Sequence, residues 1–240
     1  MRLRVSLAFS LLAALCAASS AFSVVGGTAD GTAHPYVGAA LQTQVHDGRT
    51  GTQLCSGALV STTVFLTAAH CFPDGSTVRV TFSSDFKSPS ATFVTGTAHD
   101  SSDADVAVIV LNTPVTDVGL AQLPTLGYDD TLPNNQLVDV VGYGVEAFDH
   151  RIPLPASTGP RQVATTPVKS AGNLADESLK LLADPGACFG DSGGPNLVQG
   201  TNSLVAITSS GNSNCKGVSF ALRVDTPVAR AFLGQFVSLP

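Results

Sequence analysis

Short runs of β-branched and other apolar residues recur along the whole chain, each bounded by glycine, proline, asparagine, aspartate or serine. Runs of this length between turn-forming clusters are typical of strands. The pattern predicts strands over residues 36–41, 55–66, 77–82, 106–111, 136–141, 204–208 and 218–224. Only residues 226–234 are typical of a helix, because Asp225 or Thr226 can cap them and Pro227 stands in the first turn. We therefore expect an all-β protein, although periodicity does not show how the strands close.

One serine, Ser192, lies among glycines and beside an acid in residues 187–195. Gly190, Gly193 and Gly194 permit backbone geometries in which N–H groups crowd around the serine as an oxyanion hole. The same spacing also fits the nucleophile elbow of an α/β-hydrolase, or a plain surface turn. The five histidines all precede Ser192: His34, His46, His70, His99 and His150. The α/β-hydrolase order of serine, acid and histidine is therefore excluded, and histidine, aspartate, serine remains.

His70 and Asp105 are the candidate partners of this serine. His70 follows an apolar run, residues 64–69, and precedes Cys71. Asp105 precedes the apolar run 106–111, where a carboxylate can hold the imidazole tautomer and stabilise the imidazolium. Asp103 is the alternative acid, and the acids here could instead solvate the loop. The candidate catalytic residues are therefore His70, Asp105 and Ser192.

Several segments together resemble the chymotrypsin-like serine protease family. They are residues 66–71 around His70, 105–108, 190–195 around Ser192, and the Val-Val-Gly-Gly-Thr sequence of 24–28, which is similar to the family's mature amino terminus. The resemblance implies two six-stranded Greek-key β-barrels packed together, with the active site between them and a C-terminal helix. It assigns residues 24–128 to the first barrel and 129–240 to the second. The absence of tryptophan and the few cysteines are similar to bacterial, particularly actinobacterial, members.

The resemblance also implies a mechanism for a serine endopeptidase. Ser192 would attack the scissile carbonyl, His70 would take and return the proton, and Asp105 would orient His70. The N–H groups of Gly190 and Ser192 would stabilise the oxyanion. This chemistry requires no cofactor and no metal.

Residues 1–23 are typical of a secretory signal peptide, with Arg2 and Arg4 before an apolar stretch over 5–18 and small residues after it. The apolar stretch is shorter than the roughly 20 residues that span a membrane, so we expect no stable membrane association. The expected location is extracellular.

In the family, the α-amino group of the first mature residue pairs with the aspartate before the nucleophile, here Val24 with Asp191. The residue before Val24 departs from the family, since Ser23 stands where Arg or Lys is usual and a trypsin-type activator would find no site. One cut after Ser23 would both export the protein and free the amine. A cut after Ser20 or Ala21 would instead leave a very short propeptide.

Export would remove Cys16 and leave four cysteines, for which three disulfide pairings are possible. The resemblance favours Cys55 with Cys71 and Cys188 with Cys215. A zinc site is the competing use of these residues, but no Cys-x-x-Cys pair occurs.

The residues that the resemblance assigns to the primary specificity pocket are Gly186, Ser209, Gly211, Gly217 and Ser219. Gly186 would form the floor of the pocket, so no carboxylate would be present there to pair with a basic substrate side chain. Gly211 would offer main-chain pairing to an extended substrate. A two-residue ambiguity leaves either Gly217, which would admit aromatic side chains, or Ser219, which would narrow the slot, on the opposite wall. We expect an apolar preference at P1, the substrate residue before the scissile bond, with small or medium side chains favoured.

The net charge of −6 and the absence of a Lys/Arg run argue against nucleic acid and anionic membranes as partners. The expected partners are polypeptide substrates and protein protease inhibitors, and the expected state is a monomer. The alternative function is a catalytically silent secreted binding protein on the same scaffold. Reaction with active-site reagents would distinguish the two.

Overall fold

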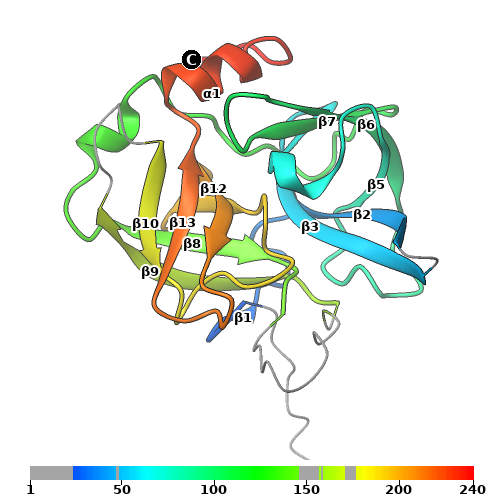
Figure 1. Ribbon diagram of the computed structural model, residues 1–240, viewed down its shortest axis with the longest axis horizontal. Helices are drawn as coiled ribbons and strands as arrows, with labels where there is room; N and C mark the ends of the chain where they lie inside the picture. Colours follow the sequence, from blue (N-terminus) through cyan, green and yellow to red (C-terminus); the bar gives the residue numbers. More distant parts are fainter. Residues whose placement is uncertain (1–23, 47–48, 146–156, 158, 171–176) are drawn as a thin grey trace, which may run out of the picture.

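The computed structural model describes residues 24–46, 49–145, 157, 159–170 and 177–240, so the expected signal peptide lies outside the described residues. The described part contains thirteen strands, two 3₁₀ turns and one α-helix. The strands form two antiparallel sheets that lie side by side, each closing into a barrel (Figure 1). The predicted all-β fold of two barrels is confirmed.

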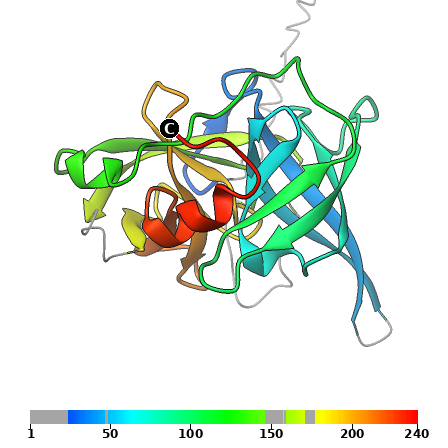
Figure 2. The same cartoon turned by 90° about the horizontal axis from the view of Figure 1, so that it is seen from above.

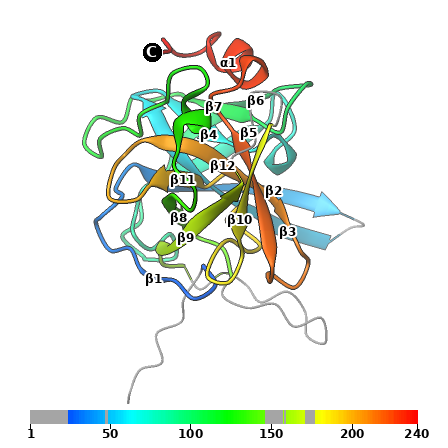
Figure 3. The ribbon, with the colours of Figure 1, turned by 90° about the vertical axis from the view of Figure 1, so that its left-hand side faces the viewer.

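The first barrel closes in the order β2-β3-β4-β7-β6-β5. Its strands are β2 (Val37–His46), β3 (Arg49–Ser61), β4 (Val64–Thr67), β5 (Thr77–Thr81), β6 (Val94–Asp100) and β7 (Ala107–Leu111). Residues 55–66, expected as one strand, form β3 and β4, because a turn at residues 62–63 reverses the chain. The hairpin of β2 and β3 extends beyond the barrel (Figure 3). The interior is apolar and fully buried, with Leu59, Phe65, Leu66, Val108 and Ile109 at its centre.

The second barrel runs β9-β10-β13-β12-β11-β8, and pairing of β8 with β9 closes it. Its strands are β8 (Leu137–Gly142), β9 (Gln162–Ser170), β10 (Ser178–Leu182), β11 (Pro195–Val198), β12 (Leu204–Gly211) and β13 (Val218–Arg223). A short strand near the amino-terminal end, β1 (Thr28–Ala29), pairs with β9. The beginning of the described chain is therefore attached to the second barrel, not to the first.

The only helix of the described residues, α1 (Pro227–Leu233), follows β13 but packs toward the first barrel. The Thr226 hydroxyl caps it by accepting the Ala229 N–H at 3.3 Å. Just beyond the helix, Phe236 stacks on His99 of β6 with ring centroids 5.5 Å apart. Figure 2 shows α1 lying across the junction of the two barrels. No helix in the described residues is long and apolar enough to cross a membrane.

A buried ionic cluster lies where η2 (Tyr128–Thr131) meets the end of β13. The Arg223 guanidinium contacts Asp225 at 2.9 Å and Asp130 at 2.8 Å. Asp129 is fully buried, and its carboxylate comes no closer than 3.5 Å to Arg223. Neither carboxylate oxygen of Asp129 accepts a hydrogen bond within the described part of the chain. Asp129 is therefore a carboxyl group whose charge is poorly compensated.

Candidate active site

His70 lies in the 3₁₀ turn η1 (Ala69–Cys71), directly after the buried strand β4. The disulfide between Cys55 and Cys71 ties this turn to β3, as predicted. The apolar residues before His70 pack in the interior of the first barrel. His70 therefore lies at the point where the chain leaves the core. The ring is consequently anchored on both sides but remains partly exposed, at 43% of its side chain.

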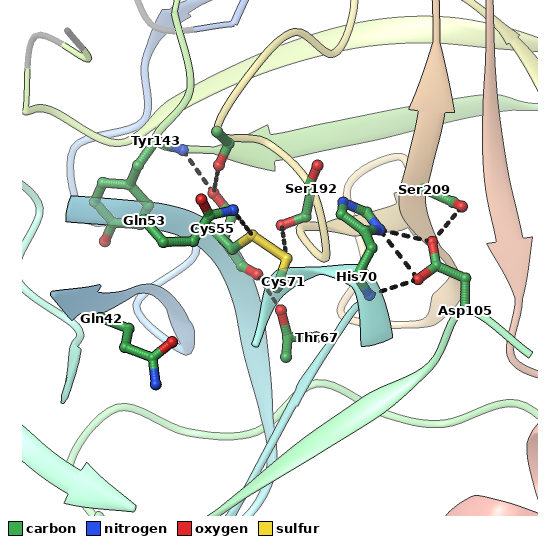
Figure 4. Close-up of a disulfide and its surroundings, with 12 residues drawn as sticks. Gln42, Gln53, Cys55, Thr67, His70, Cys71, Asp105, Tyr143, Ser192 and Ser209 are labelled. Carbon is green, nitrogen blue, oxygen red and sulfur yellow. Dashed lines mark hydrogen bonds and ion pairs between the residues drawn. A yellow bond between two sulfur atoms is a disulfide. The ribbon is translucent and has the colours of Figure 1, made fainter. Parts of the chain in front are cut away.

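Asp105 lies against His70, with one carboxylate oxygen 2.9 Å and the other 3.0 Å from Nδ1 (Figure 4). It also accepts the backbone N–H of His70 at 3.0 Å and the Ser209 hydroxyl at 2.5 Å. Burial raises the pKa of Asp105, but the hydrogen bonds from His70 and Ser209 outweigh it and leave the pKa below its ordinary value. Asp103, the alternative acid, contacts Ser102 in an exposed loop. The structure brings Asp105, and not Asp103, to the imidazole.

Ser192 lies on the side of the His70 ring away from Asp105 (Figure 4). Both residues line the same cavity, which has a volume of about 600 Å³. The loop around the serine turns sharply, with φ of +95° at Gly190 and +76° at Gly193. A side chain at Gly193 would meet the Thr67 hydroxyl and the backbone of β3, so only glycine fits this close approach.

The backbone N–H groups of Gly190 and Ser192 donate no hydrogen bond within the described residues. The carbonyls of the same peptide units are both engaged, since Phe189 accepts from Val145 and Asp191 accepts from Gly194, each at 2.8 Å. In a trans peptide the N–H points opposite to the C=O. Two unused donors therefore face away from these bonds, at a cavity that Gly190 and Ser192 both line.

Asp191 is fully buried beneath this loop. Its carboxylate accepts the N–H groups of Gly144 at 2.8 Å and Cys188 at 2.9 Å, and no cationic side chain pairs with it among the described residues. Burial raises its pKa to about 7, despite these two hydrogen bonds. Val24 is also fully buried, and Val25 exchanges two 3.0 Å backbone hydrogen bonds with Gly186. The segment that would carry a freed amine is thus already packed into the second barrel.

The cavity continues from Ser192 along residues of β12 and β13, beside the predicted Cys188–Cys215 disulfide, which is confirmed. Three residues assigned to the specificity pocket line it: Ser209, Gly211 and Ser219. Gly211 and Ser219 face each other across the strand pair, and a Cβ on Gly211 would lie 3.5 Å from that of Ser219.

Gly186 and Gly217 do not line this cavity. Gly186 instead pairs with Val25, and Gly217 accepts the N–H of Ala183 through its carbonyl at 3.0 Å. Ala183, which the sequence did not single out, lines the cavity in their place. Its position depends on the approach of the 183–188 segment to β13, and no local motif marks it. Of the two residues that the sequence left open for this wall, Ser219 lines the cavity and Gly217 does not.

The sequence model of the Trypsin family matches residues 24–232. The chain belongs to the trypsin family of serine proteases. Among solved structures, HL collagenase is 20% identical with a TM-score of 0.69, and the alignment covers 92% of this chain and 99% of that one. A structure of HBP is 19% identical with a TM-score of 0.70, covering 90% of this chain and 98% of that one. A search of curated protein sequences found no match.

The structural likeness to these two proteins shows the trypsin fold. Two disulfides in this fold are typical of secreted proteins, because disulfides persist in oxidising compartments.

Proposed function

We propose that this trypsin-family protein is a secreted serine endopeptidase that cleaves polypeptides through an acyl-enzyme on Ser192. One observation carries the proposal. The His70–Asp105 pair, the Ser192 side chain and two unused backbone N–H groups converge on a single cavity.

The roles follow from the contacts. Asp105 accepts from Nδ1 of His70 and so leaves Nε2 unprotonated in the neutral ring, available to take the proton of Ser192. The attack converts the scissile carbonyl into an oxyanion, which the N–H groups of Gly190 and Ser192 would stabilise. His70 then returns the proton to the leaving amine, and water repeats the sequence to release the acyl group. No metal or cofactor takes part in this scheme.

The preferred P1 side chain is proposed to be small and apolar. The cavity residues that support this are Ala183, Ser210 and Ser219, whose side chains are short, and no carboxylate occurs among the described residues that line the slot. A basic P1 side chain would lose its hydration there without gaining an ionic partner. Gly211 pairs with β13 on one side, and among the described strands β11 pairs with the other side of β12 only as far as Ile207, so an extended substrate can pair with this second edge at Gly211.

Maturation is proposed to occur by one cut between Ser23 and Val24, made by a peptidase that recognises small residues. The buried Asp191 supports this, because it has two N–H donors but no cationic partner in the part of the chain that the structure describes. The new α-amino group of Val24 would supply the cation.

The decisive experiment is labelling of secreted protein with a fluorophosphonate probe, which reacts with a serine only when base and oxyanion hole are assembled. Labelling that maps to Ser192 and disappears in Ser192→Ala would establish the activity. A P1-varied peptide library would then test the specificity. Folded protein beginning at Val24 that takes up no probe would refute the proposal and favour a silent scaffold. Amino-terminal sequencing of active material that begins at Ala21 or Phe22 would refute the proposed cut.

A further inference from the structure

A buried serine of the first barrel, Ser56, reaches across to the nucleophile loop of the second. It lies in β3 next to Cys55 and has no exposed surface. Its hydroxyl donates to the carbonyl of Gly190 at 2.9 Å and accepts the N–H of Tyr143 at 2.9 Å. Its backbone N–H donates to the carbonyl of Ser192 at 2.9 Å. One residue thus holds two carbonyls of the nucleophile loop.

These two bonds complete a pattern along residues 189–192. Val145 and Gly194 hold the carbonyls of 189 and 191, and Ser56 holds those of Gly190 and Ser192. All four carbonyls of this stretch are engaged, while the two N–H groups assigned to the oxyanion donate to no described residue. The orientation of the loop is therefore fixed largely through its carbonyls, together with the Asp191 N–H, which donates to Cys188 at 3.1 Å.

Gly190 most needs such a restraint. Its φ of +95° is accessible because it lacks a Cβ, and glycine rotates more freely than any other residue. The Ser56 hydroxyl is the donor to its carbonyl. Rotation of the 190–191 peptide would break this bond and would change the backbone angles of Gly190, which join this peptide to the one that carries the Gly190 N–H.

The space around the hydroxyl is closed. A Cβ added at Gly142 would lie 3.0 Å from Ser56 Oγ, and one added at Gly194 would lie 3.1 Å from Ser56 Cβ. Both neighbours are glycines, and the serine fills the room that they leave. A hydroxyl enclosed in this way keeps its two partners, because buried polar groups lose free energy when they are left unpaired.

We propose that Ser56 is a positioning residue of the proposed protease: its hydroxyl holds the 190–191 peptide while Val145 holds the 189–190 peptide, and together they fix the backbone angles of Gly190 so that its N–H is aimed at the oxyanion. The inference rests on the proposed function. Ser56 touches no substrate atom, because it has no exposed surface and is absent from the cavity lining. Its effect would pass through Gly190.

The test compares the unmodified enzyme with Ser56→Ala on a peptide amide with a small apolar P1 residue. Loss of an oxyanion donor lowers kcat by about 10²- to 10³-fold, so misalignment of one donor should lower kcat by roughly 10- to 100-fold. KM should change by less than about threefold, because the ground-state carbonyl uses the donors weakly. Affinity for a peptide boronate, whose tetrahedral adduct occupies the oxyanion hole, should fall in parallel with kcat.

The matched control is Thr81→Val. Thr81 is another buried hydroxyl of the first barrel, and it accepts the N–H of Ser83 at 3.2 Å without reaching the nucleophile loop. It should lose stability but retain kcat. Ser56→Gly, which removes the hydroxyl without adding bulk, should repeat the kinetic loss if Ser56→Ala folds poorly.

Two outcomes would overturn the positioning role: kcat within twofold of the unmodified enzyme in a folded Ser56 variant, or an equal kinetic loss in Thr81→Val. Failure of the unmodified enzyme to label at Ser192 would instead overturn the proposed function. The two failures are therefore distinguishable.

Discussion

Replacement of Asp129 by asparagine should stabilise the protein, and increasingly so as the pH rises. Burial, the neighbouring charge of Asp225 and that of Asp130 raise the pKa of Asp129 to about 8, and Arg223 only partly opposes them. In the unfolded chain the same carboxyl titrates near 3.8. Between these values the folded state holds a proton that the unfolded state has released.

The sign follows from proton linkage. Because the folded state binds more protons, the free energy of unfolding decreases by about 1.4 kcal/mol for each pH unit between the two pKa values. The total at pH 7 is about 4 kcal/mol relative to a group that does not titrate. Asparagine has no such linkage. The difference in unfolding free energy between Asp129→Asn and the parent should therefore grow by about 3 kcal/mol from pH 5 to pH 7, and level off above pH 8.

The assay is urea unfolding from pH 4.5 to pH 9, with both proteins carrying Ser192→Ala to prevent self-digestion. Asp130→Asn is the control, because Asp130 is partly exposed and its carboxylate contacts Arg223 at 2.8 Å. That variant loses this contact and should be less stable than the parent. A stability difference for Asp129→Asn that stays constant across the whole pH range would refute the reasoning.

Three further predictions concern the site and its supports. Asp105→Asn should lower kcat by about 10⁴-fold with an unchanged thermal midpoint, because the amide favours the wrong imidazole tautomer; a loss below tenfold would contradict the assignment. Ser219→Gly should raise kcat/KM for a P1 phenylalanine relative to alanine by about tenfold or more, measured on paired peptides, whereas an unchanged ratio would show that Ser219 does not limit the slot. Replacing Cys188 and Cys215 together by alanine opens a bridge of 27-residue separation and should cost about 3 kcal/mol in urea unfolding; an unchanged midpoint would contradict this.

The strands that sequence predicted are those with uninterrupted apolar runs, such as β4, β7 and β12. The described strands that it missed were β1, β6, β9, β10 and β11. β6 contains glycine, two threonines and a histidine, and β9 contains a proline and a lysine. Such sequences form strands because their neighbours in the barrel offer paired edges, which is a property of the tertiary structure. The local pattern therefore identified the fold class but not the full strand set.

The residues of the candidate site fall into the same two groups: those that a local sequence pattern marks, and those that only the tertiary structure brings together. His70, Asp105 and Ser192 stand in short motifs whose order along the chain excluded other arrangements, so sequence could name them. Ser56 and Ala183 carry no such signal, because each matters through a neighbour far away in the chain: Ser56 through Gly190, and Ala183 through Gly217, whose carbonyl accepts its N–H. The two-residue ambiguity at this wall likewise depended on the register of β12 with β13.

Each end of the described chain packs on the barrel formed by the other half of the sequence. Strand β1 pairs with the second barrel, and the region after α1 packs on the first. Each barrel is therefore contacted by a segment from the opposite end of the sequence, while each disulfide joins residues within one barrel. A single cut in the stretch that connects the barrels, residues 112–136, would leave two fragments that remain associated through the contacts of β1 and of the region after α1. Damage by a neighbouring protease at that point would show on a denaturing gel but leave the cleft between the barrels assembled.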